Sequence, residues 1–304
     1  MREYIYGKLD RGPIEFGSRR AEKEREIMKI ARKNVVCVPP TMPIKGVAET
    51  MVEYDTRRMP IVQPGTNKIQ GIVVTRDIID FLGGGERYNL IKNKHNGNFL
   101  SAINESVREI MSHDVAYIKD NQSVGDTLKK MYEENVGGFP ILDKNSTVIG
   151  IVEEEDFVYN LAGIWSGFKI DEIMSKDLTT ITPGFTIGDT CRLMIKNYRR
   201  RIPVISDDEL VGIVTTFDII NYFASSKMLE RMRGENVEQA LNARISEIMT
   251  KDVKTVKPYE DVGKAIEIME KCKIGLLPVV DENSIVGIIT ERDILEKMMQ
   301  EGNV

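Results

Sequence analysis

The sequence predicts a mixed α/β (α+β) fold made of four copies of one unit, each with the order strand, helix, strand, strand, helix. Three observations support this prediction. A proline within an apolar run, a turn, a second apolar run and an aspartate follow one another four times. A helical pattern with a methionine nine residues before the proline precedes each copy, and a short β-prone stretch precedes that helix. Because four copies agree at these positions, the units are internal repeats.

Each unit begins with the β-prone stretch, twenty-two residues before the proline, as in the LTTIT segment around Ile181. Apolar residues then recur sixteen, twelve and nine residues before the proline. Steps of four and three place these residues on one face of a helix. The methionine is an adaptable core filler at that spot. The prolines are Pro60, Pro140, Pro203 and Pro278, and the methionines are Met51, Met131, Met194 and Met269.

Two strands and a second helix complete the unit. β-branched residues around the proline predict the first of these strands, as at Val279 and Val280. Asp281, Glu282 and Asn283 supply a turn, and the next apolar run predicts the second strand. A helix then begins near the repeated aspartate, six residues after a glycine. The glycines are Gly71, Gly150, Gly212 and Gly287, and the aspartates are Asp77, Asp156, Asp218 and Asp293.

The prolines lie 80, 63 and 75 residues apart, so the spacers between units differ. We expect repeats at residues 34–88, 107–164, 165–226 and 244–304, an N-terminal arm at 1–33, and linkers at 89–106 and 227–243. Segment 89–106 is rich in Asn and Lys without periodicity and predicts a loop, whereas 227–243 is more helical. A charged helix at 18–33 is expected to lie on the first domain, with a partner-binding arm as the alternative. A half-covered sheet is marginal alone, so we expect units 1 and 2, and units 3 and 4, to pair.

Composition and motifs indicate a soluble protein without catalytic machinery. The net charge is -5 with 29% charged residues, which does not favour nucleic acid as a partner. No apolar run approaches the ~18 residues of a membrane span, and the N-terminus lacks a signal-peptide core. Cysteines 37, 191 and 272 lack paired spacing, as expected in a reducing, cytoplasmic compartment. The two histidines have no ligands at metal spacing, and neither a GxSxG elbow nor a Walker A loop is present. We therefore expect no enzyme and no metal site.

The repeat resembles the cystathionine β-synthase (CBS) domain. The pattern h-P-h-h, then G-h-h-x-x-x-D, carries the resemblance, together with a Met-Ser-x-Asp or Met-Thr-x-Asp lead-in at Met111, Met174 and Met249. It covers about residues 34–300, and the paired units resemble two Bateman modules. Four units in one chain resemble the γ regulatory subunit of AMP-activated protein kinase and stand-alone prokaryotic proteins of the same layout. The resemblance implies a flat disc with ligand clefts between paired units. Unit 1 departs from it, since Asn34 replaces the lead-in aspartate.

The resemblance implies that the repeated aspartate binds a ribose. A carboxylate can accept hydrogen bonds from both hydroxyls of a ribose diol, so the chemistry fits. The alternative is a capping box, because Thr290 and Thr215 precede their aspartates by three residues. Val74 and Glu153 hold that position in units 1 and 2 and are poor caps, which favours a ligand role. The expected ribose ligands are Asp293, Asp218, Asp77 and Asp156, with the hydroxyls of Thr290, Thr215 and Thr75 beside them.

The resemblance also implies that the residues two and three before the proline face the phosphates. These are arginines in units 1 and 3, whereas units 2 and 4 carry Gly137-Gly138 and Gly275-Leu276, which leave room for a ligand. Arginine forks suit phosphate oxygens, although an arginine that leads into a strand is often only solvated. The expected phosphate ligands are Arg57, Arg58, Arg200 and Arg201, with Arg76 and Arg292 just before two of the aspartates.

The four clefts differ in their charges. Asp293, with Thr290 and Arg292, is expected to face Arg200 and Arg201 in the best-equipped cleft. Asp218 and Asp77 are expected in further clefts. Asp156 follows three glutamates, which repel a phosphate, but it is expected opposite Arg57 and Arg58, so its cleft is left open. We expect two or three occupied sites.

Taken with these patterns, the resemblance implies a non-catalytic regulatory protein that binds AMP, ADP and ATP as a sensor of energy state. The alternatives are a module for S-adenosylmethionine or methylthioadenosine, and an architectural scaffold; a hidden enzyme is the least favoured. The arginine pairs favour nucleotides, because a cationic sulfonium gains nothing from them. Family analogy suggests a protein kinase or another regulated protein as partner, no nucleic acid and no membrane, for a monomeric disc or a homodimer.

Overall fold

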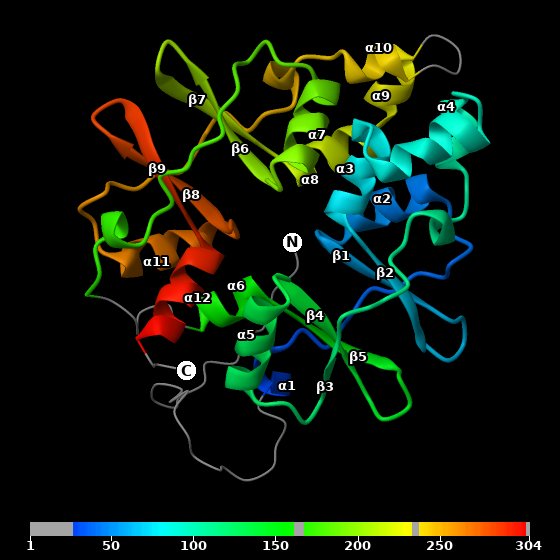
Figure 1. Ribbon diagram of the computed structural model, residues 1–304, viewed down its shortest axis with the longest axis horizontal. Coiled ribbons are helices and arrows are strands. Elements are labelled where there is room, and N and C mark those ends of the chain that lie inside the picture. Colours follow the sequence, from blue (N-terminus) through cyan, green and yellow to red (C-terminus); the bar gives the residue numbers. More distant parts are fainter. Residues whose placement is uncertain (1–26, 161–166, 233–236, 302–304) are drawn as a thin grey trace.

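The structure is a computed structural model that describes residues 27–160, 167–232 and 237–301. Its four units lie around a common centre and form a flat disc, viewed face-on in Figure 1. The predicted α+β fold of four paired repeats is confirmed. We call units 1 and 2 the first module, and units 3 and 4 the second module.

Each unit contains a helix, a two-stranded hairpin and a second helix. Unit 1 has α2 (Ile44–Glu53), β1 (Arg58–Val62), β2 (Ile69–Val74) and α3 (Thr75–Gly83). Unit 2 has α5 (Val124–Glu133), β4 (Gly138–Leu142), β5 (Val148–Glu153) and α6 (Glu154–Tyr159). Unit 3 has α7 (Ile187–Lys196), β6 (Arg201–Ser206), β7 (Glu209–Thr215) and α8 (Thr216–Ala224). Unit 4 has α11 (Val262–Cys272), β8 (Leu276–Asp281), β9 (Ser284–Thr290) and α12 (Glu291–Gln300).

The predicted first strand of the unit is short. In unit 2 it is β3 (Ile118–Lys119), which pairs in parallel with β4. In the other units it is a single parallel bridge, made by Val38, Ile181 and Val256. The segments outside this pattern carry α1 (Ile27–Ile30), η1 (Glu86–Tyr88), η2 (Leu90–Lys94), α4 (Phe99–Ile103), η3 (Val107–Glu109), η4 (Ile170–Glu172), α9 (Ser226–Arg231), α10 (Glu238–Leu241) and η5 (Ile245–Glu247).

Strands join the units within a module, and helices join the two modules. Lys68 bridges Thr147 between units 1 and 2, and Glu209 pairs with Ser284 between units 3 and 4. Helices α2 and α3 of unit 1 pack on α7 and α8 of unit 3, while α6 of unit 2 packs on α11 and α12 of unit 4. The two large apolar cores therefore each span both modules, one through units 1 and 3 and the other through units 2 and 4.

A lead-in segment of each unit crosses to the sheet of its partner. Ser112, Ser175, Thr250 and Arg32 are the crossing residues, and each bridges the residue that follows the repeated glycine of the partner unit. In three of these crossings the lead-in methionine packs on the glycine, as Met111 does on Gly71. The glycine is needed there because a side chain would occupy the space of the crossing segment. This exchange explains why the glycine and the Met-Ser or Met-Thr lead-in recur together.

The connecting segments differ in part from the expectation. The described part of the arm, residues 27–32, packs on unit 2 of the first module, because Ile27 is buried in the core of units 2 and 4. Residues 18–26 of the expected helix lie outside the described residues. The segment 89–106 is not a loop, since η2 and α4 form within it. Its few apolar residues are enough to anchor it, with Phe99 buried 6.2 Å from Phe81 and 6.1 Å from Phe223, measured between ring centroids.

We expect Gly71→Ala to lower the free energy of unfolding by about 1–3 kcal/mol, the usual cost of overpacking. A methyl group at this position would lie 2.6 Å from Met111 Sδ and 2.9 Å from the carbonyl oxygen of Ser112. Gly184→Ala is the control, because the nearest atom would be 4.0 Å away. Denaturant unfolding measures both variants, and equal stabilities would contradict the role assigned to the crossing.

Candidate functional site

The four repeated aspartates occupy the same place, in the first turn of the second helix of each unit. In every unit one carboxylate oxygen, Oδ2, accepts a 2.7 Å hydrogen bond from a backbone N–H three residues earlier. Thr215 and Thr290 also donate their hydroxyls to this oxygen, at 2.7 and 2.6 Å. A carboxylate at this position caps the helix whatever side chain precedes it. Val74 and Glu153 are poor caps, but this does not count against a capping role, because Asp77 and Asp156 cap their helices with their own carboxylates. Any ligand contact therefore depends on the other oxygen, Oδ1.

The environments of Oδ1 separate the first module from the second. Asp77 Oδ1 lies 2.9 Å from Arg87 Nη2, and Asp156 Oδ1 lies 3.5 Å from Arg32 Nε. Across the described ranges, Oδ1 of Asp218 and of Asp293 has no hydrogen bond or ion pair. Burial raises the pKa of Asp77 to about 6 and that of Asp156 to about 7, and it also raises the pKa of Asp218 and of Asp293.

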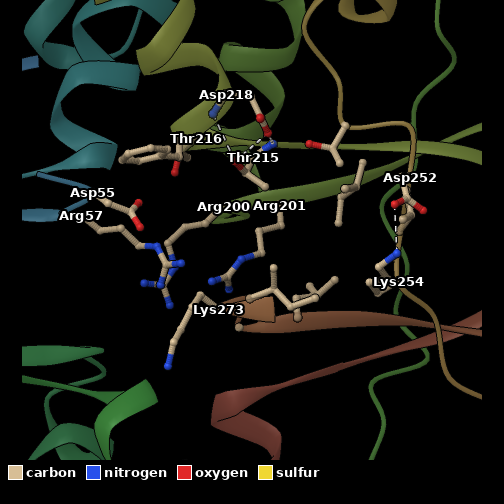
Figure 2. A pocket seen from close by; sticks show the side chains of 17 residues that line it. Asp55, Arg57, Arg200, Arg201, Thr215, Thr216, Asp218, Asp252, Lys254 and Lys273 are labelled. Atoms are coloured by element: carbon tan, nitrogen blue, oxygen red, sulfur yellow. Dashed lines mark hydrogen bonds and ion pairs between the residues drawn. The ribbon is translucent and has the colours of Figure 1, made fainter. Parts of the chain in front are cut away.

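A cavity of about 270 Å³ lies in front of Asp218 (Figure 2). Asp218 and Thr215 form one wall, and Arg200 and Arg201 reach in from the start of β6. Arg57 of unit 1 extends to the same place. The apolar lining comes from Ile213, Val253, Ile274 and Leu276, and the remaining lining residues are Asp55, Thr216, Phe217, Thr250, Asp252, Lys254, Lys273 and Gly275.

The arginines around this cavity differ in how well they are neutralised. The side chain of Arg201 has no hydrogen bond or ion pair with any residue that the structure describes, although the negative charge of Glu291 acts on it from a greater distance. Burial, followed by the positive charge of Arg57, lowers the pKa of Arg201 to about 10, so it keeps its charge at neutral pH. Arg200 lies 3.6 Å from the nearest carboxylate oxygen, on Glu154. Arg57 lies 3.2 Å from Glu155, and Arg58 is tightly paired with Glu153.

The remaining predicted arginines point elsewhere. Arg292 lies 2.7 Å from Glu154, and Arg76 stacks 4.2 Å from the ring centre of Tyr198. The cavity with the unpaired arginine therefore belongs to Asp218, whereas the sequence favoured Asp293, which is not among its lining residues. Two predicted residues remain. Thr290 is the N-cap of α12 and donates its hydroxyl to Asp293, and Thr75 contacts Thr216 at the interface of units 1 and 3.

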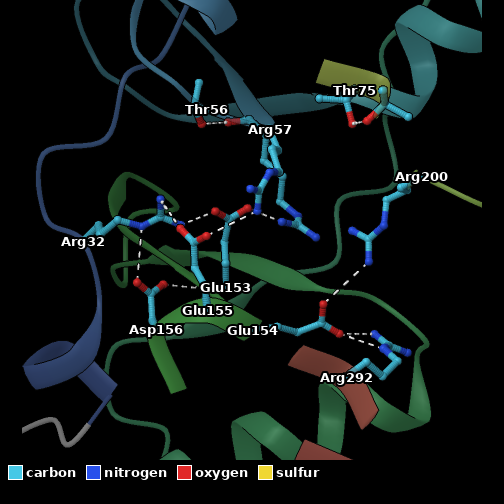
Figure 3. Close-up of polar contacts among 12 residues, drawn as sticks. Arg32, Thr56, Arg57, Thr75, Glu153, Glu154, Glu155, Asp156, Arg200 and Arg292 are labelled. Carbon is cyan, nitrogen blue, oxygen red and sulfur yellow. Dashed lines mark hydrogen bonds and ion pairs between the residues drawn. The ribbon is translucent and has the colours of Figure 1, made fainter. Parts of the chain in front are cut away.

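Sequence reasoning treated the three glutamates before Asp156 only as a repulsive charge, and it missed both their arginine partners and Glu291 at the centre of the disc. Glu153, Glu154 and Glu155 pair with arginines from other segments of the chain (Figure 3). Glu291 is 4% exposed, and its Oε1 has no hydrogen-bond partner. The available signal was the residue two before each repeated aspartate, which is threonine in units 1 and 3 and glutamate in units 2 and 4. Within the described ranges, no group of three metal-binding side chains occurs, and no helix is long and apolar enough to cross a membrane.

Comparisons with known proteins agree with this architecture. A family model for the CBS domain matches four times, over residues 25–84, 107–163, 170–225 and 245–300. Protein MJ1225 of Methanocaldococcus jannaschii is 43% identical over 273 residues, which are 89% of this chain and 98% of that protein. Its crystal structure, described as that of a proposed archaeal homologue of γ-AMPK, matches with a TM-score of 0.85 and 42% identity over 90% of this chain and 99% of that one.

Two more distant proteins extend the comparison. A 33.4 kDa protein from the ribosomal RNA operon of Thermofilum pendens is 29% identical over 261 residues, 86% of this chain and 87% of that protein. A conserved protein from Pyrococcus horikoshii shares the fold, with a TM-score of 0.54 and 20% identity over 88% of this chain and 97% of that one.

The buried Glu291 predicts a pH dependence of stability. Burial raises its pKa from 4.5 to about 7, despite the attraction of Arg201 and Arg57. Between these values the folded state holds a proton that the unfolded state has lost, so stability falls as pH rises. The cost at pH 8 is at most about 3.5 kcal/mol, at ~1.4 kcal/mol for each pH unit between the two pKa values. Asp77 and Asp156 act in the same direction.

We therefore expect Glu291→Gln to raise the melting temperature at pH 8 and to flatten its decline between pH 5 and pH 8. Thermal unfolding of the ligand-free protein at several pH values measures this. Glu133→Gln, an exposed change on α5, is the control and should leave the slope unchanged. Parallel slopes for wild type and Glu291→Gln would refute the assignment.

Proposed function

This chain belongs to the CBS-domain family, and from that premise we propose that it is a non-catalytic, cytoplasmic regulatory protein that binds adenine nucleotides in the Asp218 cavity. The observation that carries the proposal is the unpaired Arg201 on the cavity wall. A half-buried guanidinium with no hydrogen-bonded counter-ion is poorly compensated, and a bound anion supplies the missing hydrogen bonds. Asp218, with one free carboxylate oxygen, lies on the same cavity.

The three kinds of lining match the three parts of a nucleotide. The free oxygen of Asp218 is an acceptor for the hydroxyls of a ribose. The apolar side chains Ile213, Val253, Ile274 and Leu276 suit a purine ring. Arg57, Arg200 and Arg201 suit phosphate oxygens, to which guanidinium groups bind in bidentate fashion. A volume of about 270 Å³ is at the lower end for ligand sites, which favours a mononucleotide over a dinucleotide.

The charge of the cavity also separates the candidate ligands. S-adenosylmethionine carries a sulfonium cation, which three arginines repel. Methylthioadenosine is neutral and would leave Arg201 unpaired. A purely architectural role would leave the same charge buried without benefit. AMP, ADP and ATP each supply the missing anion, and they differ in the charge that they bring to it.

Binding would change how the two modules are arranged relative to each other. Arg57 belongs to the first module and Arg201 to the second, while Glu154 of unit 2 lies 3.6 Å from Arg200. A phosphate at this place competes with Glu154 for Arg200, so it favours one arrangement of the modules over another. This supports an energy-state sensor, in which AMP, ADP and ATP stabilise the arrangements to different extents. We propose that a protein kinase or another regulated protein responds to the relative arrangement of the two modules. We propose further that the disc is a monomer or a homodimer.

Thermal-shift and calorimetric titrations with AMP, ADP, ATP and S-adenosylmethionine test the ligand class. A nucleotide at ~100 times its dissociation constant should stabilise wild type by about 2.7 kcal/mol. Asp218→Asn should weaken nucleotide binding by about 10- to 100-fold, the cost of hydrogen bonds to a charged group. Asp189→Asn is the matched control, because the exposed Asp189 takes part in the same kind of Thr-x-x-Asp cap at the start of α7. Equal losses of affinity in both variants would contradict a ribose contact at Asp218.

A second substitution tests the phosphate contact by itself. Arg201→Met should weaken AMP, ADP and ATP by at least about tenfold while leaving adenosine unchanged, because it removes only the cation. Arg192→Met, an exposed arginine of the same unit, is the control. Undiminished nucleotide affinity in Arg201→Met would refute the proposed site. A response of wild type to S-adenosylmethionine alone would replace the nucleotide by that ligand.

A further inference from the structure

We infer that two arginines of the chain itself, Arg32 and Arg87, fill the Asp156 and Asp77 clefts, so that the first module is closed to nucleotides and the second module carries all binding. The inference rests on the proposed function for the identity of the ligand. Under this inference the first module binds no ligand, Arg32 and Arg87 are the residues that close it, and each chain binds at most two ligands. The contacts that the two arginines make support this assignment.

Arg32 holds a place that faces the ligand cleft in the other units. It is the counterpart of Ser112, Ser175 and Thr250, because all four residues bridge the position after the repeated glycine of the partner unit. Thr250 lines the Asp218 cavity. A residue at this place in unit 1 is therefore directed at Asp156 of unit 2, and that residue is an arginine in place of a hydroxyl side chain.

The Asp156 cleft neutralises its own charges. Arg32 pairs tightly with Glu153 and lies 3.1 Å from Glu155 and 3.5 Å from Asp156, as Figure 3 shows. Arg57 and Arg58 pair with Glu155 and Glu153 from the opposite side. Three guanidinium groups thus meet three carboxylates in this cleft. A phosphate would have to displace carboxylates that are already paired, and a ribose would have to displace Arg32.

The backbone holds Arg32 in this position. Its N–H donates to the carbonyl of Ile151 at 2.9 Å, and its carbonyl accepts from the N–H of Ile151 at 3.0 Å. Ile27, five residues earlier, is fully buried in the core of units 2 and 4. The described residues 27–32 are therefore anchored on unit 2 at both ends, and this fixed stretch of backbone places the arginine.

Arg87 closes the Asp77 cleft from the other side of unit 1. Its guanidinium lies 2.9 Å from Asp77 and 3.2 Å from Asp80, and it donates to the carbonyl of Ile110 at 2.7 Å and to the Ser112 hydroxyl at 3.4 Å. Ser112 is the counterpart of Thr250 in the Asp218 cavity. Arg87 therefore lies between an aspartate and a lead-in hydroxyl, the two groups that flank the open cavity of unit 3.

A tight turn brings Arg87 to this place. Gly84 ends α3 with a φ of 83°, in the left-handed region that favours glycine. Gly85 then passes so close to the carboxylate of Asp80 that a side chain there would collide with it. The Gly83-Gly84-Gly85 run thus folds the chain back over the cleft. The second module has no such plug in its described part, since Oδ1 of Asp218 and of Asp293 contacts no arginine.

The stoichiometry of AMP binding to the full chain, by equilibrium dialysis or calorimetry, tests the inference without any substitution. Wild type should bind no more than two AMP per chain, with Asp77→Ala and Asp156→Ala leaving that number unchanged. Asp218→Ala and Asp293→Ala together should abolish binding. Three or four AMP per wild-type chain, or a ligand lost on Asp77→Ala or Asp156→Ala, would overturn the inference.

Opening the closed clefts provides a gain-of-site test. The double variant Arg32→Ser, Glu153→Thr gives the Asp156 cleft the same residue types as the Asp293 cleft, where Ser175 and Thr290 hold the equivalent positions. It removes one positive and one negative charge, and it leaves Arg58 without its glutamate partner. The second variant is Arg87→Met. Arg87 follows Asp77 by ten residues, and the residue that follows Asp218 by ten is Met228, so methionine is the equivalent residue of unit 3. Each opened variant that keeps a cooperative thermal transition should bind one more AMP, lost again on Asp156→Ala or Asp77→Ala. A folded variant with no added AMP would count against the inference.

A ligand-free measurement separates this inference from the proposed function. If wild type binds no AMP, the proposed function fails, and the closure of the cleft is then decided by a double-mutant cycle. Arg32→Ser and Asp156→Asn should together lower the melting temperature by less than the sum of their single effects, because they remove the same interaction. Strictly additive shifts would show that Arg32 does not close the cleft.

Discussion

The pairing of charges at the centre of the disc decides which clefts are open. Units 1 and 3 bring arginines to this place, and units 2 and 4 bring glutamates. Glycines in units 2 and 4 make the meeting possible. A side chain at Gly137 would lie 2.7 Å from Arg58 and 2.8 Å from Glu154, and one at Gly275 would collide with Glu291. The centre is therefore filled by long charged side chains from opposite units, which would have to shift if either glycine carried a side chain.

This pairing is uneven, and the unevenness separates the two modules. In the first module three arginines meet three carboxylates, and Arg87 covers Asp77. In the second module Arg201 has no partner among the described residues, and the buried Glu291 keeps a carboxylate oxygen without a hydrogen bond. The interfaces between modules follow the same division. Thr216 contacts Thr75 at 3.2 Å between units 1 and 3, whereas glutamates hold both equivalent positions between units 2 and 4.

The repeat pattern was sufficient to predict the fold and the position of the aspartates. Spacing identifies helices, strands and turns because these depend on local periodicity, and four copies remove ambiguity. The pattern could not predict the cores shared by units 1 and 3 and by units 2 and 4, since those depend on how modules face one another. The roles of Arg32 and Arg87 lay outside the repeat altogether. Their partners are set by the path of the backbone before and after unit 1, which no spacing rule records. The sequence ranked the Asp293 cleft as the best equipped, whereas Arg200 and Arg201 line the cavity of Asp218 in their own unit.

The crossing of lead-in segments also fixes the order in which the chain can complete its parts during synthesis. The strand of unit 1 receives its crossing segment from Ser112, and unit 2 receives Arg32, which has left the ribosome long before. The first module can thus close once residue 160 or so is available. Unit 3, in contrast, sends Ser175 to Ile288, so the second module stays unfinished until the last strand emerges. Since domains generally fold as units from the N-terminus, the first module is expected to form first and to offer its helices as a template for the second module, which completes the two shared cores.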